Sequence, residues 1–154
     1  MAISSEAMRT GKRIYWTKVT VTSAVVSYSL ADNTAKKIPW NSVVNAWKEG
    51  DLDTTNRAVK VRFPGKNKIF GMIGVTGDAG DTTMDYILQI KNGSTVIKTK
   101  KGMIPKNGTI EFYHEQEGLN ANDLIYVYVT VDGNASAKAI TVDAANTYLV
   151  VEKM

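Results

Sequence analysis

The chain has 154 residues, of which 44% are hydrophobic and 22% are charged, so it is long enough for one globular domain and too apolar to be disordered throughout. It has no cysteine, which excludes disulfides and thiolate metal sites and is typical of a reducing compartment. The net charge of +4 is mild but uneven: residues 1–106 carry 17 Lys or Arg and 8 Asp or Glu, whereas residues 107–154 carry 2 and 7.

The uneven charge indicates which partners the chain suits, and the lengths of its apolar runs indicate where it is made. Opposite charge in the two halves favours docking between copies of the chain or onto an acidic surface, unless strands from both halves interleave and cancel it. The sequence has neither the run of about 7–15 apolar residues of a signal peptide nor the run of about 18 of a membrane span. We therefore expect synthesis in the cytoplasm and no membrane partner.

The chain begins with a polar arm and two predicted strands. Residues 1–13 are polar apart from Ile3 and Met8, which predicts an N-terminal arm outside the core. The domain then extends over residues 14–154. Residues 14–22 are rich in β-branched and aromatic side chains, and residues 23–30 alternate between apolar and other side chains, so both segments are predicted to be strands.

One segment interrupts the β pattern. Trp40, Val43, Val44 and Trp47 fall at helical spacing, and Gly50 follows as a possible end signal. This spacing predicts one short helix.

The remaining segments again predict strands separated by turns. Alternating or apolar runs occupy residues 58–63, 69–75, 84–90, 95–100, 110–114, 124–131, 139–142 and 148–152. Asn92-Gly93 predicts a tight hairpin, and Gly71 and Gly74 predict a bulge or a close backbone approach. About nine short strands with frequent turns predict an all-β protein, an antiparallel jelly-roll sandwich with one short helix and an N-terminal arm.

No catalytic signature is present. The single histidine, His114, shares a strand face with Ile110 and Phe112 and is expected to be a structural residue, so we expect no enzymatic activity. Two pairs of acidic residues resemble the start of a calcium site without completing one, Asp51 with Asp53 and Asp78 with Asp81, so no metal or other cofactor is expected. The lysines between residues 60 and 106 are not interleaved with exposed aromatics, so nucleic acid is not expected either.

Residues 124–131 pose a packing problem, because neither face of this predicted strand is charged. Leu124, Tyr126 and Tyr128 share one face with Thr130, and the other face is aliphatic. A sandwich normally leaves one face of each sheet in water. We expect another subunit to cover the second face, in preference to the helix or the arm, and we expect a subunit interface formed by Tyr113, Leu124, Tyr126, Tyr128 and Tyr148.

The last 40 residues resemble the end of the jelly rolls of the tumour-necrosis-factor and complement-globular-head superfamily. The resemblance rests on Leu119, Asn122, Asp123, Ile125, Val127, Val129, Tyr148 and Leu149, which form a turn, an apolar and aromatic strand, a loop and a final strand. It implies a three-fold assembly with the late aromatic strands near the axis. Similar modules occur in bacteriophage virion proteins, both as capsid decoration (cement) proteins and as fibre heads.

The absence of a signal peptide and of cysteine favours the virion proteins among these relatives. We expect a homotrimeric decoration protein on the surface of a phage capsid, made in the bacterial cytoplasm, with the major capsid protein as its partner. The arm would contact the capsid through Ile3, Met8, Arg9, Lys12 and Arg13. The alternatives are a fibre or tail head that binds host sugars, or a carbohydrate-binding module, with ligand-binding loops at residues 76–81 and 133–137.

Overall fold

The computed structural model describes residues 16–22, 30, 33–46, 51–133 and 140–154. Eleven strands lie in these residues: β1 (Trp16–Thr20), β2 (Lys36–Lys37), β3 (Ser42–Asn45), β4 (Leu52–Asp53), β5 (Ala58–Lys60), β6 (Gly65–Thr76), β7 (Thr83–Asn92), β8 (Thr95–Pro105), β9 (Thr109–Leu119), β10 (Leu124–Gly133) and β11 (Thr141–Lys153). The predicted arm, residues 1–13, lies outside the described residues.

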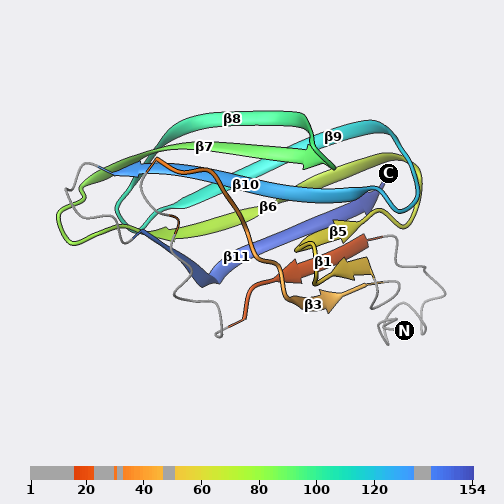
Figure 1. The fold of residues 1–154 in the computed structure, drawn as a ribbon, viewed down its shortest axis with the longest axis horizontal. Coiled ribbons are helices and arrows are strands. Elements are labelled where there is room, and N and C mark those ends of the chain that lie inside the picture. Colours follow the sequence, from red (N-terminus) through yellow and green to blue (C-terminus); the bar gives the residue numbers. More distant parts are fainter. Residues whose placement is uncertain (1–15, 23–29, 31–32, 47–50, 134–139) are drawn as a thin grey trace.

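The strands form two antiparallel sheets packed face to face (Figure 1). Sheet A has the order β3-β1-β11-β6-β9, and sheet B has the order β4-β5-β10-β7-β8, with β2 also paired to β10. The last strand, β11, lies between β1 and β6, so the acidic and basic halves of the sequence interleave within sheet A. The predicted antiparallel jelly-roll sandwich is thereby confirmed.

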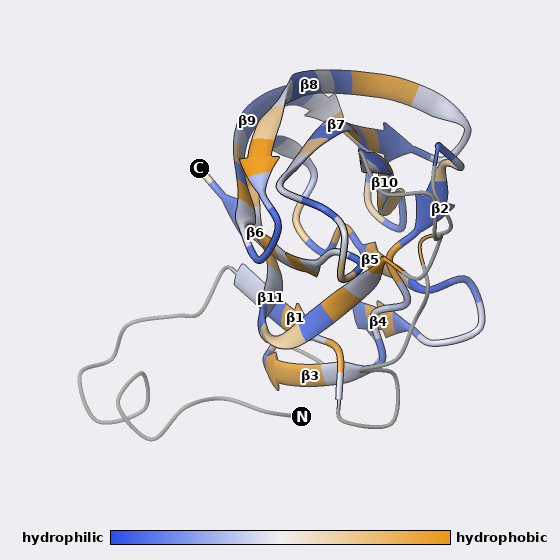
Figure 2. Cartoon of the chain, turned by 90° about the vertical axis from the view of Figure 1, so that its left-hand side faces the viewer, coloured by the Kyte–Doolittle hydropathy of each residue, from blue (hydrophilic) through white to orange (hydrophobic). Residues whose placement is uncertain are grey.

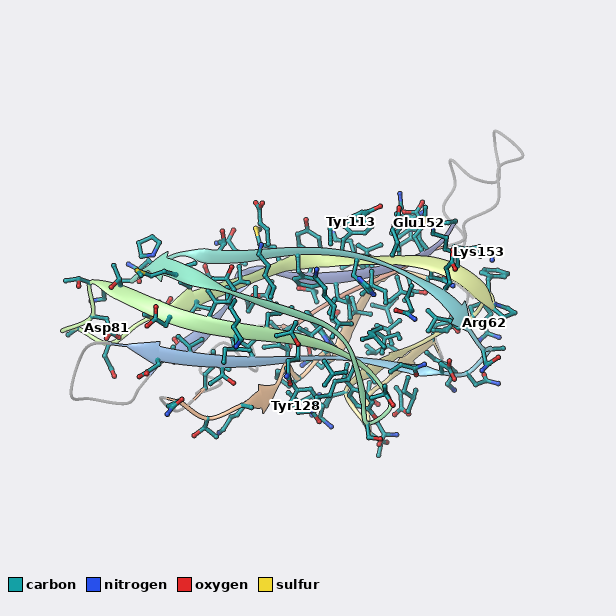
Figure 3. The ribbon with its side chains drawn as sticks, turned by 90° about the horizontal axis from the view of Figure 1, so that it is seen from above. Arg62, Asp81, Tyr113, Tyr128, Glu152 and Lys153 are labelled. Carbon is teal, nitrogen blue, oxygen red and sulfur yellow. The ribbon has the colours of Figure 1, made fainter. Side chains whose placement is uncertain are left out.

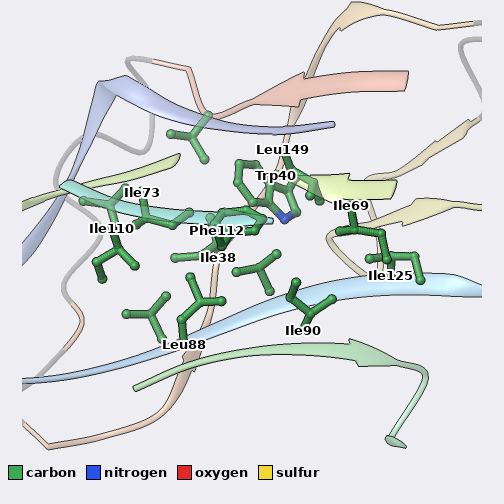
Figure 4. Close-up of a cluster of buried hydrophobic side chains, with 14 of the residues drawn as sticks. Ile38, Trp40, Ile69, Ile73, Leu88, Ile90, Ile110, Phe112, Ile125 and Leu149 are labelled. Atoms are coloured by element: carbon green, nitrogen blue, oxygen red, sulfur yellow. The ribbon is translucent and has the colours of Figure 1, made fainter. Parts of the chain in front are cut away.

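The core lies between the sheets because alternate residues of each long strand point inward. Figure 4 shows Ile69, Phe112 and Leu149 of sheet A facing Leu88 and Ile125 of sheet B. All five side chains are buried. The ribbon coloured by hydropathy in Figure 2 shows the matching alternation of apolar and polar residues along the strands.

The predicted short helix is wrong. Ser42–Asn45 form strand β3, which pairs with β1, and Val19 lies opposite Val43. Trp40 is fully buried in the core, whereas Val44 is 56% exposed, so the residues at helical spacing do not share one buried face. Two consecutive β-branched valines beside an available strand favour extended backbone. Trp47 and Gly50, the rest of the predicted helix, lie outside the described residues.

Two predicted strands near the carboxyl end are one strand with a bulge. The register between β11 and β6 shifts between Asp143 and Tyr148. Within the bulge the Thr147 hydroxyl donates to the Asp143 carbonyl at 2.6 Å and accepts from the Gly74 amide at 3.0 Å, so a side chain replaces part of the backbone ladder.

The predicted close approach at the β6 glycines is confirmed. A Cβ on Gly71 would lie 2.1 Å from the Tyr148 carbonyl oxygen. The hairpin at Asn92-Gly93 is also confirmed: Asn92 pairs with Thr95, and Gly93 has φ of 60°.

Candidate functional site

The residues predicted to form one subunit interface lie on two opposite outer faces of the sandwich. Tyr113 and Tyr148 point outward from sheet A, whereas Leu124, Tyr126 and Tyr128 point outward from sheet B. Figure 3 shows Tyr113 and Tyr128 on opposite sides of the two layers. The sandwich therefore offers two separate surfaces, and one contact with a flat partner cannot use both.

The first surface, which we call the aromatic face, consists of Phe70, Tyr113 and Tyr148 on the outer side of sheet A. Tyr113 is 56% exposed, and its ring centroid lies 6.2 Å from that of Phe70, tilted by 32°. Phe70 and Tyr148 are half-buried and come from the neighbouring strands β6 and β11. Three aromatic rings on adjacent strands form an adhesive surface, because such rings dominate the energetics of protein interfaces.

Several charges on the aromatic face are paired with one another. Lys66 lies 3.4 Å from Glu115, and Lys68 lies 3.2 Å from Glu152. Tyr113 donates its hydroxyl to Glu115 at 2.9 Å. This hydrogen bond, followed by the charge of Lys66, lowers the pKa of Glu115 below its ordinary value, and the same bond raises the pKa of Tyr113. The ammonium of Lys18 lies 4.6 Å from the centroid of the Tyr148 ring, outside these ion pairs, so the pairing covers only part of the charge on this face.

A shallow hollow of about 650 Å³ extends from the aromatic face to the open edge of the sandwich. Lys98 and Lys100 of β8 line it. They pair with the inward-facing Ile90 and Leu88, so they point toward the gap between the sheet edges. The Lys100 ammonium donates to the Glu111 carbonyl of β9, the edge strand of sheet A.

The second surface, which we call the lysine–tyrosine face, consists of Lys37, Lys91, Tyr126 and Tyr128 on the outer side of sheet B. The two tyrosine rings are half-buried, with centroids 6.2 Å apart and a tilt of 48°. The Lys37 ammonium lies 5.1 Å from the centroid of Tyr126, and that of Lys91 lies 4.0 Å from the centroid of Tyr128. The uncharged outer face of β10 therefore receives part of its cover from lysines of the same chain.

Burial and neighbouring groups shift the pKa values of two residues at this face. Burial removes water from the Tyr126 hydroxyl and raises its pKa, and the charge that Tyr128 and Asp53 carry when ionised raises it further. The hydroxyl therefore remains a hydrogen-bond donor at neutral pH. Asp53 accepts hydrogen bonds from the side-chain and backbone amides of Asn56 at 2.7 and 2.9 Å, and the side-chain bond is the main reason that its pKa is lowered.

The other residues considered in the sequence lie in structural contacts. His114 lies on β9 with its Nε2 2.9 Å from Gln116, on the predicted face with Ile110 and Phe112. The Asp51 carboxylate is fully buried and accepts from the Arg62 guanidinium, with the Nε bond at 2.9 Å.

The second acidic pair forms a local turn. The Asp78 amide donates to the Asp81 carboxylate at 2.7 Å. Across the described ranges, no three His, Cys, Asp or Glu side chains come together in an arrangement that would hold a metal ion.

Two further expectations concern the arm and the membrane. Ile3, Met8, Arg9, Lys12 and Arg13, the predicted capsid contacts, lie outside the described residues. Among the residues that the structure covers, no helix has the length and apolar character needed to cross a membrane.

The sequence did not single out Phe70, Lys37 or Lys91. Phe70 and Lys91 fall on the outward parity of their strands, which the alternation of their neighbours indicates. Lys37 lies on this face because β2 pairs with β10, some 90 residues away in the sequence. No local sequence pattern predicts this pairing.

Comparisons with known proteins identify the fold. No family model matches the chain, and no curated protein matches its sequence. Among solved structures, murine APRIL at pH 8.0 is similar with a TM-score of 0.57 and 16% identity, over 90% of this chain and 98% of that chain. The Eiger TNF of S. frugiperda is similar with a TM-score of 0.50 and 13% identity, over 92% of each chain. At these identities the likeness establishes the fold alone: the chain is a jelly roll of the tumour-necrosis-factor type.

Proposed function

We propose that the chain is a structural, non-enzymatic protein that assembles with copies of itself through the aromatic face. The observation that supports this is the exposed ring of Tyr113 beside Phe70 and Tyr148. Fully burying an exposed side chain of this size contributes about 1.5–3 kcal/mol before the cost of association, and the half-buried Phe70 and Tyr148 would each add less. Lys66 and Lys68 already pair with carboxylates of the same face, so these two lysines can meet a copy of the chain without being buried unpaired.

A homotrimer is the assembly that we propose. Around a three-fold axis each subunit presents two different surfaces to its neighbours, and the ring closes. The aromatic face and the adjoining edge with Lys98 and Lys100 are two such surfaces on one side of the sandwich. The exposed carboxylate of Glu111 on the aromatic face suits the lysines of a neighbouring edge.

We further propose that the assembled jelly roll decorates and reinforces a bacteriophage capsid shell. Support comes from the small, cysteine-free jelly roll, which cannot depend on a disulfide to fold, and from the polar segment of residues 1–13 that precedes it. Binding across seams between capsid subunits would stabilise the shell, because opening the shell would expose the buried surface.

The mass of the protein in solution tests the assembly. We expect a mass near three times 16.9 kDa by sedimentation equilibrium. Tyr113→Glu should give monomers, because it places a charge among the rings, whereas the matched variant Tyr128→Glu on the opposite face should remain assembled. A monomeric parent protein, or dissociation by Tyr128→Glu alone, would contradict the proposal.

Heating of empty capsid shells tests the decoration role. Shells carrying the protein should rupture at a higher temperature than bare shells. The Tyr113→Glu variant should lose this protection if the trimer is the binding form. Equal rupture temperatures with and without the parent protein would count against the role on capsids while leaving self-assembly intact.

The second candidate function is a receptor-binding head of a phage fibre. The specific observation that favours it is the lysine–tyrosine face, which lies opposite the proposed assembly surface and stays accessible in such a trimer. Of the loops first expected to bind sugar, residues 134–137 lie outside the described residues, and Asp81 of the other loop is only 5% exposed.

A further inference from the structure

The lysine–tyrosine face holds its two ammonium groups in a set geometry. Lys37 pairs in register with Tyr128 but reaches over Tyr126, and Lys91 pairs with Tyr126 but reaches over Tyr128. Lys37 and Lys91 approach β10 from opposite sides, and each lies over the tyrosine diagonal to it and not over the tyrosine directly opposite. Because the rings restrain the lysines, an incoming anion meets charges that have already lost much of their conformational freedom.

A concave space accompanies these charges. A hollow of about 440 Å³ is lined by the four side chains and by Gly93 and Ser94 of the β7–β8 turn. No atom lies within 4 Å of the position that a Cβ on Gly93 would take, so the turn leaves the hollow open. The hollow is open to solvent, so a ligand held there would rest on the surface with one side exposed.

The charge of this hollow calls for a negative ligand. The ion pairs found within the described residues, Arg62–Asp51, Lys66–Glu115 and Lys68–Glu152, do not involve Lys91. Lys60 adds a further positive charge on the same outer face, opposite Leu124 in the register. The nearby Asp53 carboxylate, whose pKa is lowered mainly by its hydrogen bond from the Asn56 side chain and also by Lys60, stays negative and offsets part of this charge. Lys91 still offers a ligand carboxylate an ammonium group that none of these ion pairs neutralises.

The geometry favours a sugar over a peptide or a nucleic acid. β7 pairs with β10 along nearly its whole length, and the other side of β10 pairs with β5 at Leu124 and Ile125 and with β2 at Tyr128 and Val129, which leaves little free backbone edge here for an extended peptide. The lysines lie over the tyrosine rings, where nucleic-acid bases would have to stack. Sugar hydroxyls can instead bond to the Tyr126, Tyr128 and Ser94 hydroxyls around the hollow.

We propose that the lysine–tyrosine face binds a carboxylate-bearing sugar of an acidic glycan, the carboxylate lying between Lys37 and Lys91. The site goes beyond the structural role proposed above and uses the opposite face of the sandwich. Assembly and sugar binding can therefore fail independently of each other.

Calorimetric titration of the full chain tests the site with defined sugars. The acidic probes are trigalacturonate and sialyllactose, and galactotriose and lactose are their neutral counterparts. We expect at least one acidic probe to bind about tenfold or more tightly than its neutral counterpart, the difference made by a hydrogen bond to a charged group. Absence of binding by both acidic probes at millimolar concentration would overturn the proposal.

A pair of lysine variants separates a defined site from general attraction to anions. Lys91→Met removes the ammonium from the site and keeps the length of the side chain. The matched control Lys68→Met removes a lysine that lies 5.8 Å from the Phe70 ring on the aromatic face, with the same change in net charge. Lys91→Met should weaken the acidic sugar about tenfold, and Lys68→Met should leave its affinity unchanged. Unfolding midpoints should show that both variants are folded.

Two outcomes would show that the site is something else. Equal loss of affinity in both lysine variants would mean nonspecific attraction and would overturn the proposal. Tighter binding of a polyglutamate peptide than of either acidic sugar, abolished by Lys91→Met, would assign the face to an acidic protein and overturn the sugar site.

Discussion

The two outer faces of the sandwich are built from similar side chains and differ in how their charges are matched. Both carry aromatic rings with lysines beside them: Lys68 lies by Phe70 on one face, and Lys91 lies by Tyr128 on the other. On the aromatic face Lys68 also pairs with Glu152, whereas Lys91 takes part in none of the ion pairs of the described residues. The two faces thus have similar aromatic content, and they differ in the two Lys–Glu ion pairs of the aromatic face, beside which Lys18 lies over Tyr148 outside these pairs.

A core substitution should disrupt both faces at once and have the largest effect. Trp40 is fully buried between the sheets, and Trp40→Ala should lower the free energy of unfolding by about 3–5 kcal/mol in a urea titration. Trp40→Phe should cost much less, because the indole Nε1 has no hydrogen-bond partner among the described residues. Equal losses for the two variants would contradict this packing.

A glycine substitution should disturb sheet A beneath the aromatic face while sparing sheet B. Gly71→Ala forces a methyl group against the Tyr148 carbonyl and should cost about 1–3 kcal/mol of unfolding free energy. The control is Gly93→Asn on the other sheet, where φ is 60° and the space is open; asparagine tolerates this conformation. Urea unfolding of both variants should show a clear loss for Gly71→Ala alone.

Salt should affect binding at the two faces differently, and we expect this effect to be smaller than those of the two substitutions above. Raising sodium chloride should weaken binding of the acidic sugar several-fold, because exposed ammonium groups are screened. The trimer mass should change little over the same range, because its rings associate mainly through apolar burial. Calorimetric titration measures the sugar affinity and sedimentation measures the mass, each over the same series of salt concentrations. Dissociation of the trimer at high salt, with sugar binding unchanged, would contradict this assignment of the two faces.

The smallest expected effect is a pKa change on the aromatic face. Tyr113→Phe removes the hydrogen bond to Glu115 and should raise the pKa of that carboxyl toward its ordinary value in an NMR titration. Since the folded pKa is depressed, the bond contributes stability above the unfolded pKa and loses it as pH falls through the folded value. Tyr128→Phe on the other face should leave the titration of Glu115 unchanged.

Much of the fold was predictable because its signals are local. Alternation identified the long strands, Asn92-Gly93 identified the hairpin, and Gly71 identified a close approach. The helix prediction failed because Trp40, Val43 and Val44 fit a helical spacing equally well, and the pairing of β3 with β1 decided between the two structures.

The candidate surfaces were less predictable, because they depend on contacts between distant segments. The sequence identified the tyrosines but assigned them to one interface. Which sheet each joins follows from long-range pairing: Tyr148 lies beside Met72 of β6, and Tyr128 lies between Lys37 and Gln89. Such pairings join residues tens of positions apart, and no periodicity within one strand encodes them.

The position of Lys98 and Lys100 has a consequence for how copies of the chain can meet. Exposed strand edges tend to recruit strands from other molecules, and this leads to fibrils. Here Lys100 occupies a carbonyl on the edge strand β9, so an incoming strand would have to displace an ammonium group and strip it of water. Addition of another strand at the β9 edge, and with it growth of sheet A from that edge, is thereby disfavoured.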